Sequence, residues 1–294
     1  MFDHLLERVT AGGDLTTQEI SELAAAPDIL SLGMLADVVR RRIHNTRITY
    51  LRVATRACDQ VDLGVIPSSA REVRIVGTPA SLDVATGAVE KVRAASGDRV
   101  VSGFSWSDVD RVAAAAGLSV SRALAILRGA GLEALVDVPL DAIADTDQVI
   151  NCLMGAGFRQ LRFTVEKAPA SERQRLIERA SVLQEQYRAI QAINPLPTLI
   201  HAVRPTTGYD DVRAVALARL AAPNIPTVQV DWLRYGPKLA QVALTFGADD
   251  LDAVSASDDA PEGRRRAPLE EVRRSVEAAG LSPAERDGRF NVVA

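Results

Sequence analysis

Cysteine is scarce in this chain of 294 residues, which contains only Cys58 and Cys152. Two well-separated cysteines do not make a disulfide framework of the kind that small secreted proteins use. The first residues, Met1–Glu7, carry acids early and lack a basic segment followed by an apolar core, so no signal peptide is predicted. We therefore expect a cytoplasmic protein with reduced thiols.

The sequence also lacks long apolar runs, an excess of positive charge and common enzyme motifs. No apolar segment approaches the roughly 18 residues that span a bilayer. A net charge of −4 and a pI near 5.5 give no general attraction to nucleic acid or to an anionic membrane. There is no G-x-S-x-G, Walker A or H-E-x-x-H sequence, and His4, His44 and His201 share no metal-ligand spacing. We predict no membrane, nucleic-acid or metal partner.

What the sequence does contain is an alternation of short β-rich runs and helical patterns. The first 45 residues are predicted to be helical, with a capping box at Thr16 and Glu19 and a second helix over Ile29–Ile43. Strands are predicted over Ile48–Val53, Val73–Gly77, Val100–Phe104, Ala134–Val138, Leu161–Val165, Thr198–Val203 and Thr227–Trp232. Helices are predicted over Leu82–Ala95, Ser107–Ala115, Val120–Gly129, Thr146–Ala156, Ala170–Ile193, Tyr209–Ala221, Leu239–Phe246 and Leu269–Ala279.

This alternation favours a parallel sheet with helices packed on its outside. Seven predicted strands without a glycine-rich phosphate fingerprint favour a (β/α) barrel or partial barrel over a Rossmann-type sheet. We predict an α/β protein with an N-terminal helical segment over 1–46 and a barrel-like domain over 47–254. A linker and a C-terminal helical extension would then occupy 255–294.

Functional groups of (β/α) barrels gather at the C-terminal ends of the strands. The candidates at or near these ends are Thr78, Ser105, Trp106, Asp137, Glu166, His201, Arg204, Asp231, Trp232 and Arg234. An indole beside a carboxylate, as at Trp232 and Asp231, suits an aromatic ligand that carries a hydroxyl group. The alternative is structural: Trp232 packs the barrel mouth, Asp231 pairs with Arg234, and His201 is a core histidine.

Three aspartates close together, Asp249, Asp250 and Asp252, resemble a metal-binding cluster. However, they follow Gly247 at the end of a predicted helix, where acids cap the next segment. We interpret them as part of the scaffold.

Several strings in the last third of the chain occur together in one known family. They are Pro205–Val212, Gly236–Leu244, Phe246–Asp252 and Glu277–Asp287, with weaker matches at Ala11–Thr16, Glu72–Gly77 and Ala116–Leu132. In these strings the chain closely resembles the futalosine-pathway radical S-adenosylmethionine (SAM) enzymes of menaquinone biosynthesis. These are aminofutalosine synthase and dehypoxanthine futalosine cyclase, with the deazaflavin-cofactor synthase as a cousin. The resemblance implies a radical SAM type of barrel that uses a [4Fe–4S] cluster and SAM.

The chain departs from this family at the cofactor positions. The family's cluster loop has cysteines separated by three and then two residues, and the corresponding positions here hold Cys58, Asp62 and Val65. A thiolate, a carboxylate and an isopropyl group cannot hold three irons of a cubane cluster. A glycine pair that approaches SAM in the family is replaced by Gly77-Thr78-Pro79, whose side chains block a close approach. We therefore expect neither cofactor to bind.

Two functions remain open. The first is a non-catalytic partner or regulatory subunit of a menaquinone-pathway enzyme, or a small-molecule binder. The alternative is an enzyme with cluster-independent chemistry on a futalosine-like or nucleoside substrate, with Asp137, Glu166, His201 and Asp231 as acids and bases. The segment before the second strand is too short for the first barrel helix. An apolar seam would then be exposed, which predicts a related hetero-partner or a homodimer.

Overall fold

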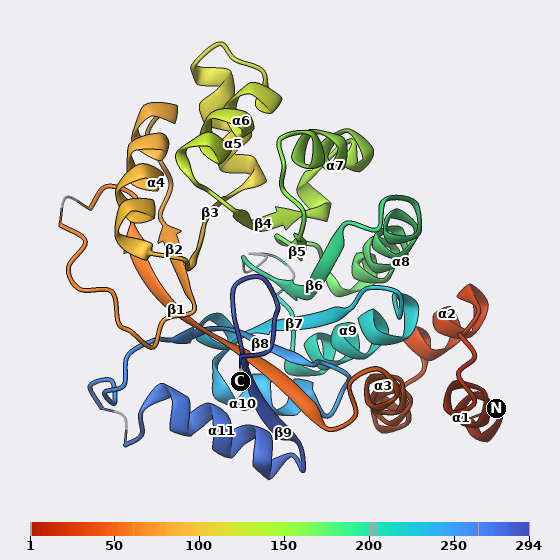
Figure 1. The fold of residues 1–294 in the computed structure, drawn as a ribbon. Helices are drawn as coiled ribbons and strands as arrows, with labels where there is room; N and C mark the ends of the chain where they lie inside the picture. Colours follow the sequence, from red (N-terminus) through yellow and green to blue (C-terminus); the bar gives the residue numbers. More distant parts are fainter. Residues whose placement is uncertain (1, 61, 200–202, 204, 264, 294) are drawn as a thin grey trace.

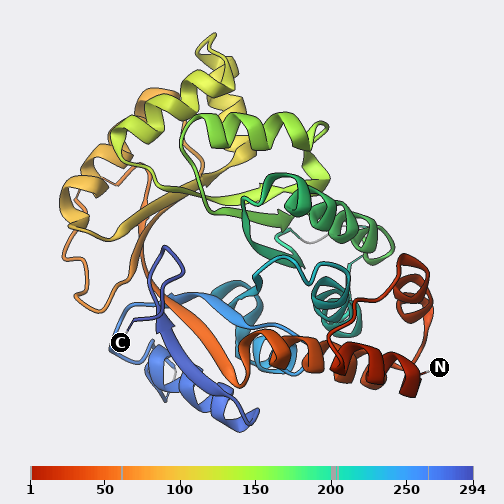
Figure 2. The ribbon, with the colours of Figure 1, turned by 45° about the vertical axis from the view of Figure 1, so that its right-hand side comes forward.

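The computed structural model describes residues 2–60, 62–199, 203, 205–263 and 265–293. Within them, eight parallel strands form a closed barrel with helices on its outside (Figures 1 and 2), which confirms the predicted fold class. The strands are β1 (Arg47–Ala57), β2 (Glu72–Val76), β3 (Val100–Ser105), β4 (Ala134–Pro139), β5 (Leu161–Val165), β6 (Ile190–Pro197), β7 (Thr227–Asp231) and β8 (Asp250–Ser255). Neighbours pair in chain order from β2 to β8, and β1 closes the barrel by pairing with both β8 and β2.

Among the described residues, three α-helices precede the barrel and eight follow its first strand. The first are α1 (Phe2–Thr10), α2 (Thr17–Ala25) and α3 (Ile29–His44), and α3 packs beside α9 (Gly208–Ala221). The others are α4 (Leu82–Ser96), α5 (Trp106–Ala115), α6 (Val120–Ala130), α7 (Thr146–Gly155), α8 (Ala170–Tyr187), α10 (Trp232–Leu244) and α11 (Pro268–Ala278). The capping box predicted at the start of α2 is present, because Thr16 and Glu19 bind each other's backbone N–H groups. Within the described ranges, no single helix is long and apolar enough to cross a membrane. Helices α5 and α6 reach the required length and apolar composition only as a pair, and this pair is bent by 109°.

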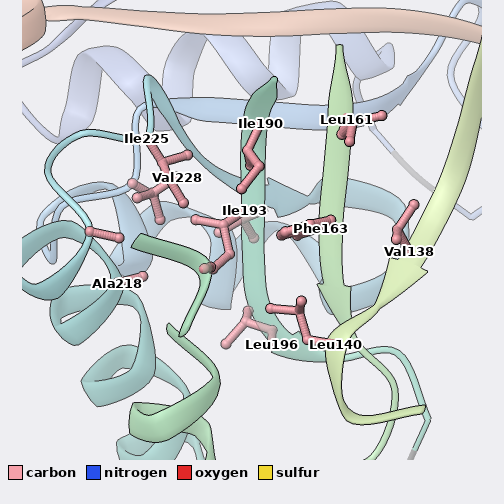
Figure 3. Packing of buried hydrophobic residues seen from close by; sticks show 14 of the residues in the cluster. Val138, Leu140, Leu161, Phe163, Ile190, Ile193, Leu196, Ala218, Ile225 and Val228 are labelled. Atoms are coloured by element: carbon pink, nitrogen blue, oxygen red, sulfur yellow. The ribbon is translucent and has the colours of Figure 1, made fainter. Parts of the chain in front are cut away.

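The core lies between the barrel and its ring of helices. Figure 3 shows Phe163 of β5 and Ile193 of β6 side by side in this layer, with Val228 of β7 nearby. All three side chains are almost completely buried. Alternate strand residues that point outward therefore hold the helices in place, while the residues that point inward determine the chemistry of the barrel.

The sixth strand differs from the prediction. β6 covers Ile190–Pro197 rather than Thr198–Val203, and the preceding helix ends at Tyr187 rather than at Ile193. Two prolines and an asparagine make the sequence of β6 a poor strand by local propensity. Burial of Ile190, Ile193 and Leu196 compensates, so the strand forms by tertiary packing.

The C-terminal segment closes the lower end of the barrel, where the strands begin. The predicted extension contains helix α11 and also a ninth strand, β9 (Ser282–Arg286), which pairs with the first half of β1 while β2 pairs with the second half. The following tail crosses the barrel opening (Figure 1), and the carbonyl oxygen of Gly288 accepts a hydrogen bond from Arg162. A Cβ atom at Gly288 would lie 2.6 Å from Cβ of Val100, so this crossing requires glycine.

Between β1 and β2, the described part of 58–71 contains no helix. The loop covers part of the surface where the helix is missing. Ile66 packs against Ala54, Ala70 and Ala256, and Ser69 donates a hydrogen bond of 2.6 Å to the carbonyl oxygen of Ala256. Val65 in this loop is 91% exposed and Val76 at the end of β2 is 39% exposed, so an exposed seam with a partner chain stays a prediction.

Candidate ligand site at the barrel mouth

A cavity of about 640 Å³ opens at the C-terminal ends of the strands. Among the predicted site residues, those that line it are Thr78, Ser105, Asp137, Glu166, Asp231 and Arg234. Further polar lining comes from Thr55, Arg74, Asp108 and Thr198, which sequence reasoning missed. The cavity therefore combines hydroxyl, carboxyl and guanidinium groups with apolar walls, which include Ile75, Phe104 and Leu233.

Neither of the two predicted tryptophans lines this cavity. Trp232 begins α10 and is only 6% exposed within the core, and Trp106 begins α5 and is half-buried against the same core. The indole of Trp232 therefore packs structurally, which was the alternative interpretation. His201 and Arg204 lie outside the described residues.

Two carboxyl groups of the cavity hold their protons more tightly than usual. Burial raises the pKa of Asp137, and the nearby guanidinium of Arg234, 3.7 Å away, only partly offsets this effect. Burial also raises the pKa of Asp231, and the negative charge of Asp252 adds to the shift. The pKa of Arg234 is raised because Asp137 and Asp231 outweigh its own burial. Paired carboxyls with raised pKa values in one cavity are typical of functional sites.

Backbone N–H groups at the mouth are occupied by the chain's own carboxylates. Asp141 accepts three hydrogen bonds of 2.6–2.8 Å from the N–H groups of residues 166–168 at the end of β5. Asp231 caps α10 through the N–H of Arg234 at 2.8 Å, and Asp108 binds the N–H of Ser105 at 3.1 Å. Such N–H groups bind phosphate in many (β/α) barrels. Here they are already satisfied by anions, so the mouth disfavours a phosphate group.

Below the cavity, inside the barrel, buried arginines and carboxylates form a network of ion pairs. Arg74 donates to both oxygens of Asp252 at 2.9 Å and to Glu72 at 2.6 and 3.0 Å. Glu72 also accepts hydrogen bonds from Ser102 at 2.6 Å and from Arg162 at 2.7 Å. Burial opposes the ionisation of Glu72, but Arg162 and Arg74 lower its pKa to about 2. The network therefore keeps a fully buried carboxylate charged.

The three neighbouring aspartates each bind a different arginine. Asp249 binds Arg219, Asp250 binds Arg286 and Asp252 binds Arg74, and Arg286 also lies 3.8 Å from Asp252, so arginines neutralise all three carboxylates. Within the described ranges, no group of three or more His, Cys, Asp or Glu residues is arranged to hold a metal ion. Of these arginines, only Arg74 lies in a strand that the sequence predicted, so its charge there is the one signal that could have pointed to a buried pair.

The loop after β1 does not fit an iron–sulfur cluster. Burial, together with the charge of Asp59, raises the pKa of the Cys58 thiol, which opposes the thiolate that iron requires. Asp62 accepts a hydrogen bond from the N–H of Gly64, and the side chain of Val65 is 91% exposed. Cys152 lies on α7 beside the hydroxyl of Ser121 at 3.2 Å, away from this loop. The three positions offer one protonated thiol and no second sulfur ligand.

Comparison with known proteins identifies relatives of this chain. Residues 191–293 match the family model of the CofH/MqnC C-terminal region. The chain is related to the CofH/MqnC enzymes. The similar proteins include a 5-amino-6-(D-ribitylamino)uracil–L-tyrosine 4-hydroxyphenyl transferase of Archaeoglobus fulgidus (34% identical, covering 38% of this chain and 36% of the transferase). Another is the aminodeoxyfutalosine synthase of Thermus thermophilus (35% identical, covering 30% and 25%).

A further relative matches almost the whole chain, at lower sequence identity. The cyclic dehypoxanthine futalosine synthase of Streptomyces coelicolor is 24% identical, with 96% of this chain and 86% of the synthase covered. The chain spans only about a third of the length of the Archaeoglobus CofH/MqnC relative. The resemblance to futalosine-pathway and deazaflavin-cofactor enzymes that the sequence predicted is confirmed.

Solved structures support the fold. Methylornithine synthase aligns with a TM-score of 0.65 at 15% identity, with 97% of this chain and 98% of the synthase covered. The [FeFe]-hydrogenase maturase HydG also aligns with a TM-score of 0.65, at 12% identity, with 96% and 75% covered. Both likenesses support the closed (β/α) barrel fold of this CofH/MqnC relative.

Proposed function

We propose that this chain is a cluster-free relative of the futalosine-pathway enzymes that binds a polyhydroxylated small molecule of the nucleoside class. The ligand would occupy the barrel mouth, and the chain would act as a non-catalytic binding or regulatory component of menaquinone biosynthesis. The observation that carries the proposal is a cavity in which hydroxyl and carboxyl groups converge, beside a loop with only one cysteine.

The chemistry of the cavity suits neutral hydroxyl groups. The carboxylates of Asp137, Glu166 and Asp231 accept hydrogen bonds from ligand hydroxyls, and Thr55 and Thr198 both donate and accept. The N–H groups that would attract phosphate are satisfied by Asp108, Asp141 and Asp231. A sugar or sugar-alcohol chain meets these requirements, and the names of the related transferases specify a ribitylamino substrate.

A second function is favoured by one observation. Asp137 and Asp231 both have raised pKa values in the same cavity, as general acids and bases of hydrolytic and isomerising enzymes do. The chain would then catalyse cluster-independent proton transfer on the same class of ligand. Mass spectrometry of a bound nucleoside after prolonged incubation separates the two functions, because only the second changes the ligand.

Isothermal titration calorimetry with adenosine and inosine, and with their 5′-monophosphates, tests the proposed ligand class. We expect at least one nucleoside to bind, and its monophosphate to bind at least tenfold more weakly, a difference of about 1.4 kcal/mol. Replacement Asp231→Asn keeps a cap for α10 but removes the charged acceptor, and should weaken binding about tenfold or more.

Asp110→Asn is the matched control, because Asp110 lies on the exposed face of α5 outside the cavity. This variant should bind as the wild type does. The proposal fails if none of the nucleosides binds, or if Asp231→Asn retains full affinity while it remains folded.

The pH dependence of binding should follow the two raised pKa values. Protonation of Asp137 and Asp231 removes charged acceptors, so affinity should fall as the pH is lowered, beginning above the ordinary aspartate pKa of 3.8.

The effect of these raised pKa values on stability has the opposite sign. A carboxyl whose pKa is higher in the folded than in the unfolded state loses stabilisation as the pH rises through that range. Thus Asp137→Asn should raise the melting temperature at neutral pH while it weakens binding, and a lowered melting temperature would contradict this expectation.

A further inference from the structure

A second pocket lies at the opposite end of the barrel, where the strands begin. It has a volume of about 260 Å³ and sits between the end of α6, the segment before β5 and the C-terminal tail. Its polar lining consists of Arg128, Glu133, Arg159, Gln160, Arg162 and Arg289. Four guanidinium groups therefore surround one carboxylate in a pocket that is distinct from the barrel mouth.

The single carboxylate of this pocket is already engaged. Glu133 binds Arg289 at 2.8 Å and Arg93 at 3.1 Å. Arg162 shares its acid, Glu72, with Arg74. The positive charge of the lining is therefore not neutralised by the protein.

Two of the arginines have only neutral partners. Arg128 donates to the carbonyl oxygen of Leu132 at 3.0 Å, and Arg159 donates to that of Met154 at 2.6 Å. In the part of the chain that the structure describes, neither arginine is within ion-pair distance of a carboxylate. In addition, the buried Nε of Arg162 has no hydrogen-bond partner among the described residues. A buried donor without a partner is unfavourable, and Arg162 itself lines the pocket.

We propose that this pocket is a binding site for a small phosphate-bearing anion. Guanidinium groups match the geometry of phosphate oxygens with two parallel hydrogen bonds, and they lose little hydration on doing so. The amide nitrogen of Gln160 donates to the carbonyl oxygen of Arg289 at 2.8 Å and so holds the tail beside the pocket. The proposal is independent of the function proposed for the mouth, where carboxylates occupy the phosphate-binding positions.

Bound phosphate would connect parts of the chain that are distant in sequence. Arg128 comes from α6, Arg159 precedes β5, and Arg289 belongs to the tail that crosses the lower opening. Arg289 also donates to the carbonyl oxygen of Asp98 before β3. Occupancy should therefore stabilise the fold and hold the tail against the barrel.

Thermal unfolding in increasing inorganic phosphate, with sodium chloride at matched ionic strength, tests the site. The full chain should show a saturable rise in melting temperature with phosphate and none with chloride. Calorimetry with inorganic phosphate and with glycerol 3-phosphate then distinguishes free phosphate from a phosphate ester, and saturable binding of either supports the site. Arg128→Gln and Arg159→Gln should each weaken binding about tenfold.

The matched control is Arg122→Gln, an exposed arginine near the start of α6 outside the pocket, which should bind phosphate as the wild type does. Arg128 is half-buried beside the ring of Phe158, so the exposed Arg159→Gln keeps the test valid if the first variant unfolds. The proposal is overturned if chloride gives the same rise, if millimolar phosphate does not bind saturably, or if folded Arg159→Gln retains wild-type affinity.

Discussion

Anaerobic reconstitution with iron and sulfide should leave the purified protein colourless, without stoichiometric iron. The physical reason is the donor set of the loop after β1. Cys58 has a raised pKa, Asp62 caps Gly64, and Val65 has no donor atom. A cubane cluster needs three thiolates from such a loop, and the chain has two cysteines in all. Iron and acid-labile sulfide analyses with visible absorbance provide the measurement, and about four irons per chain would refute the cluster-free assignment.

The double replacement Asp62→Cys with Val65→Cys supplies the missing thiols. It restores the family spacing of three and two residues with Cys58, in a loop where Val65 is already exposed. We expect this variant to take up iron and to turn brown under the same conditions. Cys152→Ser is the control and should leave the wild-type result unchanged, because Cys152 lies on α7. A double variant that remains colourless would contradict the view that missing thiolates alone prevent cluster binding.

Replacement Glu72→Gln should lower the free energy of unfolding by about 3–5 kcal/mol, the loss typical of breaking a buried ion pair. Glu72 is fully buried and serves both Arg74 and Arg162, so its neutralisation leaves two buried guanidinium groups short of negative charge. Denaturant unfolding at pH 7 measures the change through the transition midpoint. A loss below about 1 kcal/mol would contradict the importance of this network.

The control for this prediction is Glu270→Gln. Glu270 also faces two arginines, Arg266 at 3.6 Å and Arg274 at 3.2 Å, but its side chain is 50% exposed. Its replacement should change the free energy of unfolding by less than about 1 kcal/mol.

The pH dependence of stability provides a second check on the role of Glu72. The folded pKa of Glu72, about 2, lies below the ordinary value of 4.5, so its contribution is present above 4.5 and disappears as the pH falls toward 2.

The network also connects stability with the proposed binding site. Arg74 lines the mouth cavity, and its position is set by Asp252 and Glu72 beneath it. Asp252 in turn raises the pKa of Asp231 at the mouth. Buried charges that stabilise the barrel therefore also determine the electrostatic environment of the ligand.

Sequence reasoning succeeded where local signals agreed with the fold. The capping box at Thr16 is present, the predicted strand Leu161–Val165 is β5, and helix α11 ends just before Gly280 as predicted. It failed at β8, which contains Asp250 and Asp252 and was not predicted as a strand. Aspartate disfavours strands by local propensity. Arg286 and Arg74 neutralise these two aspartates inside the barrel, and neither arginine is close to its partner in sequence.

The candidate site was predicted in outline for the same reason. Parallel strands bring their C-terminal ends together, so the sequence alone was enough to place Asp137, Glu166 and Asp231 at one mouth. Which side chains point into the cavity was not predictable. Trp232 follows Asp231 directly, yet the start of α10 turns its indole into the core while Asp231 stays at the cavity.

The sequence by itself determined the family relationship, the alternation of strands and helices, and the shortage of thiols at the cluster positions. These are local or countable properties, and no folding step alters them. Only the tertiary structure decided how the barrel closes, where its buried charges are paired and how the tail covers its lower end. Arg74 and Asp252 are 178 residues apart, and their ion pair exists because barrel closure brings β2 and β8 to opposite sides of β1.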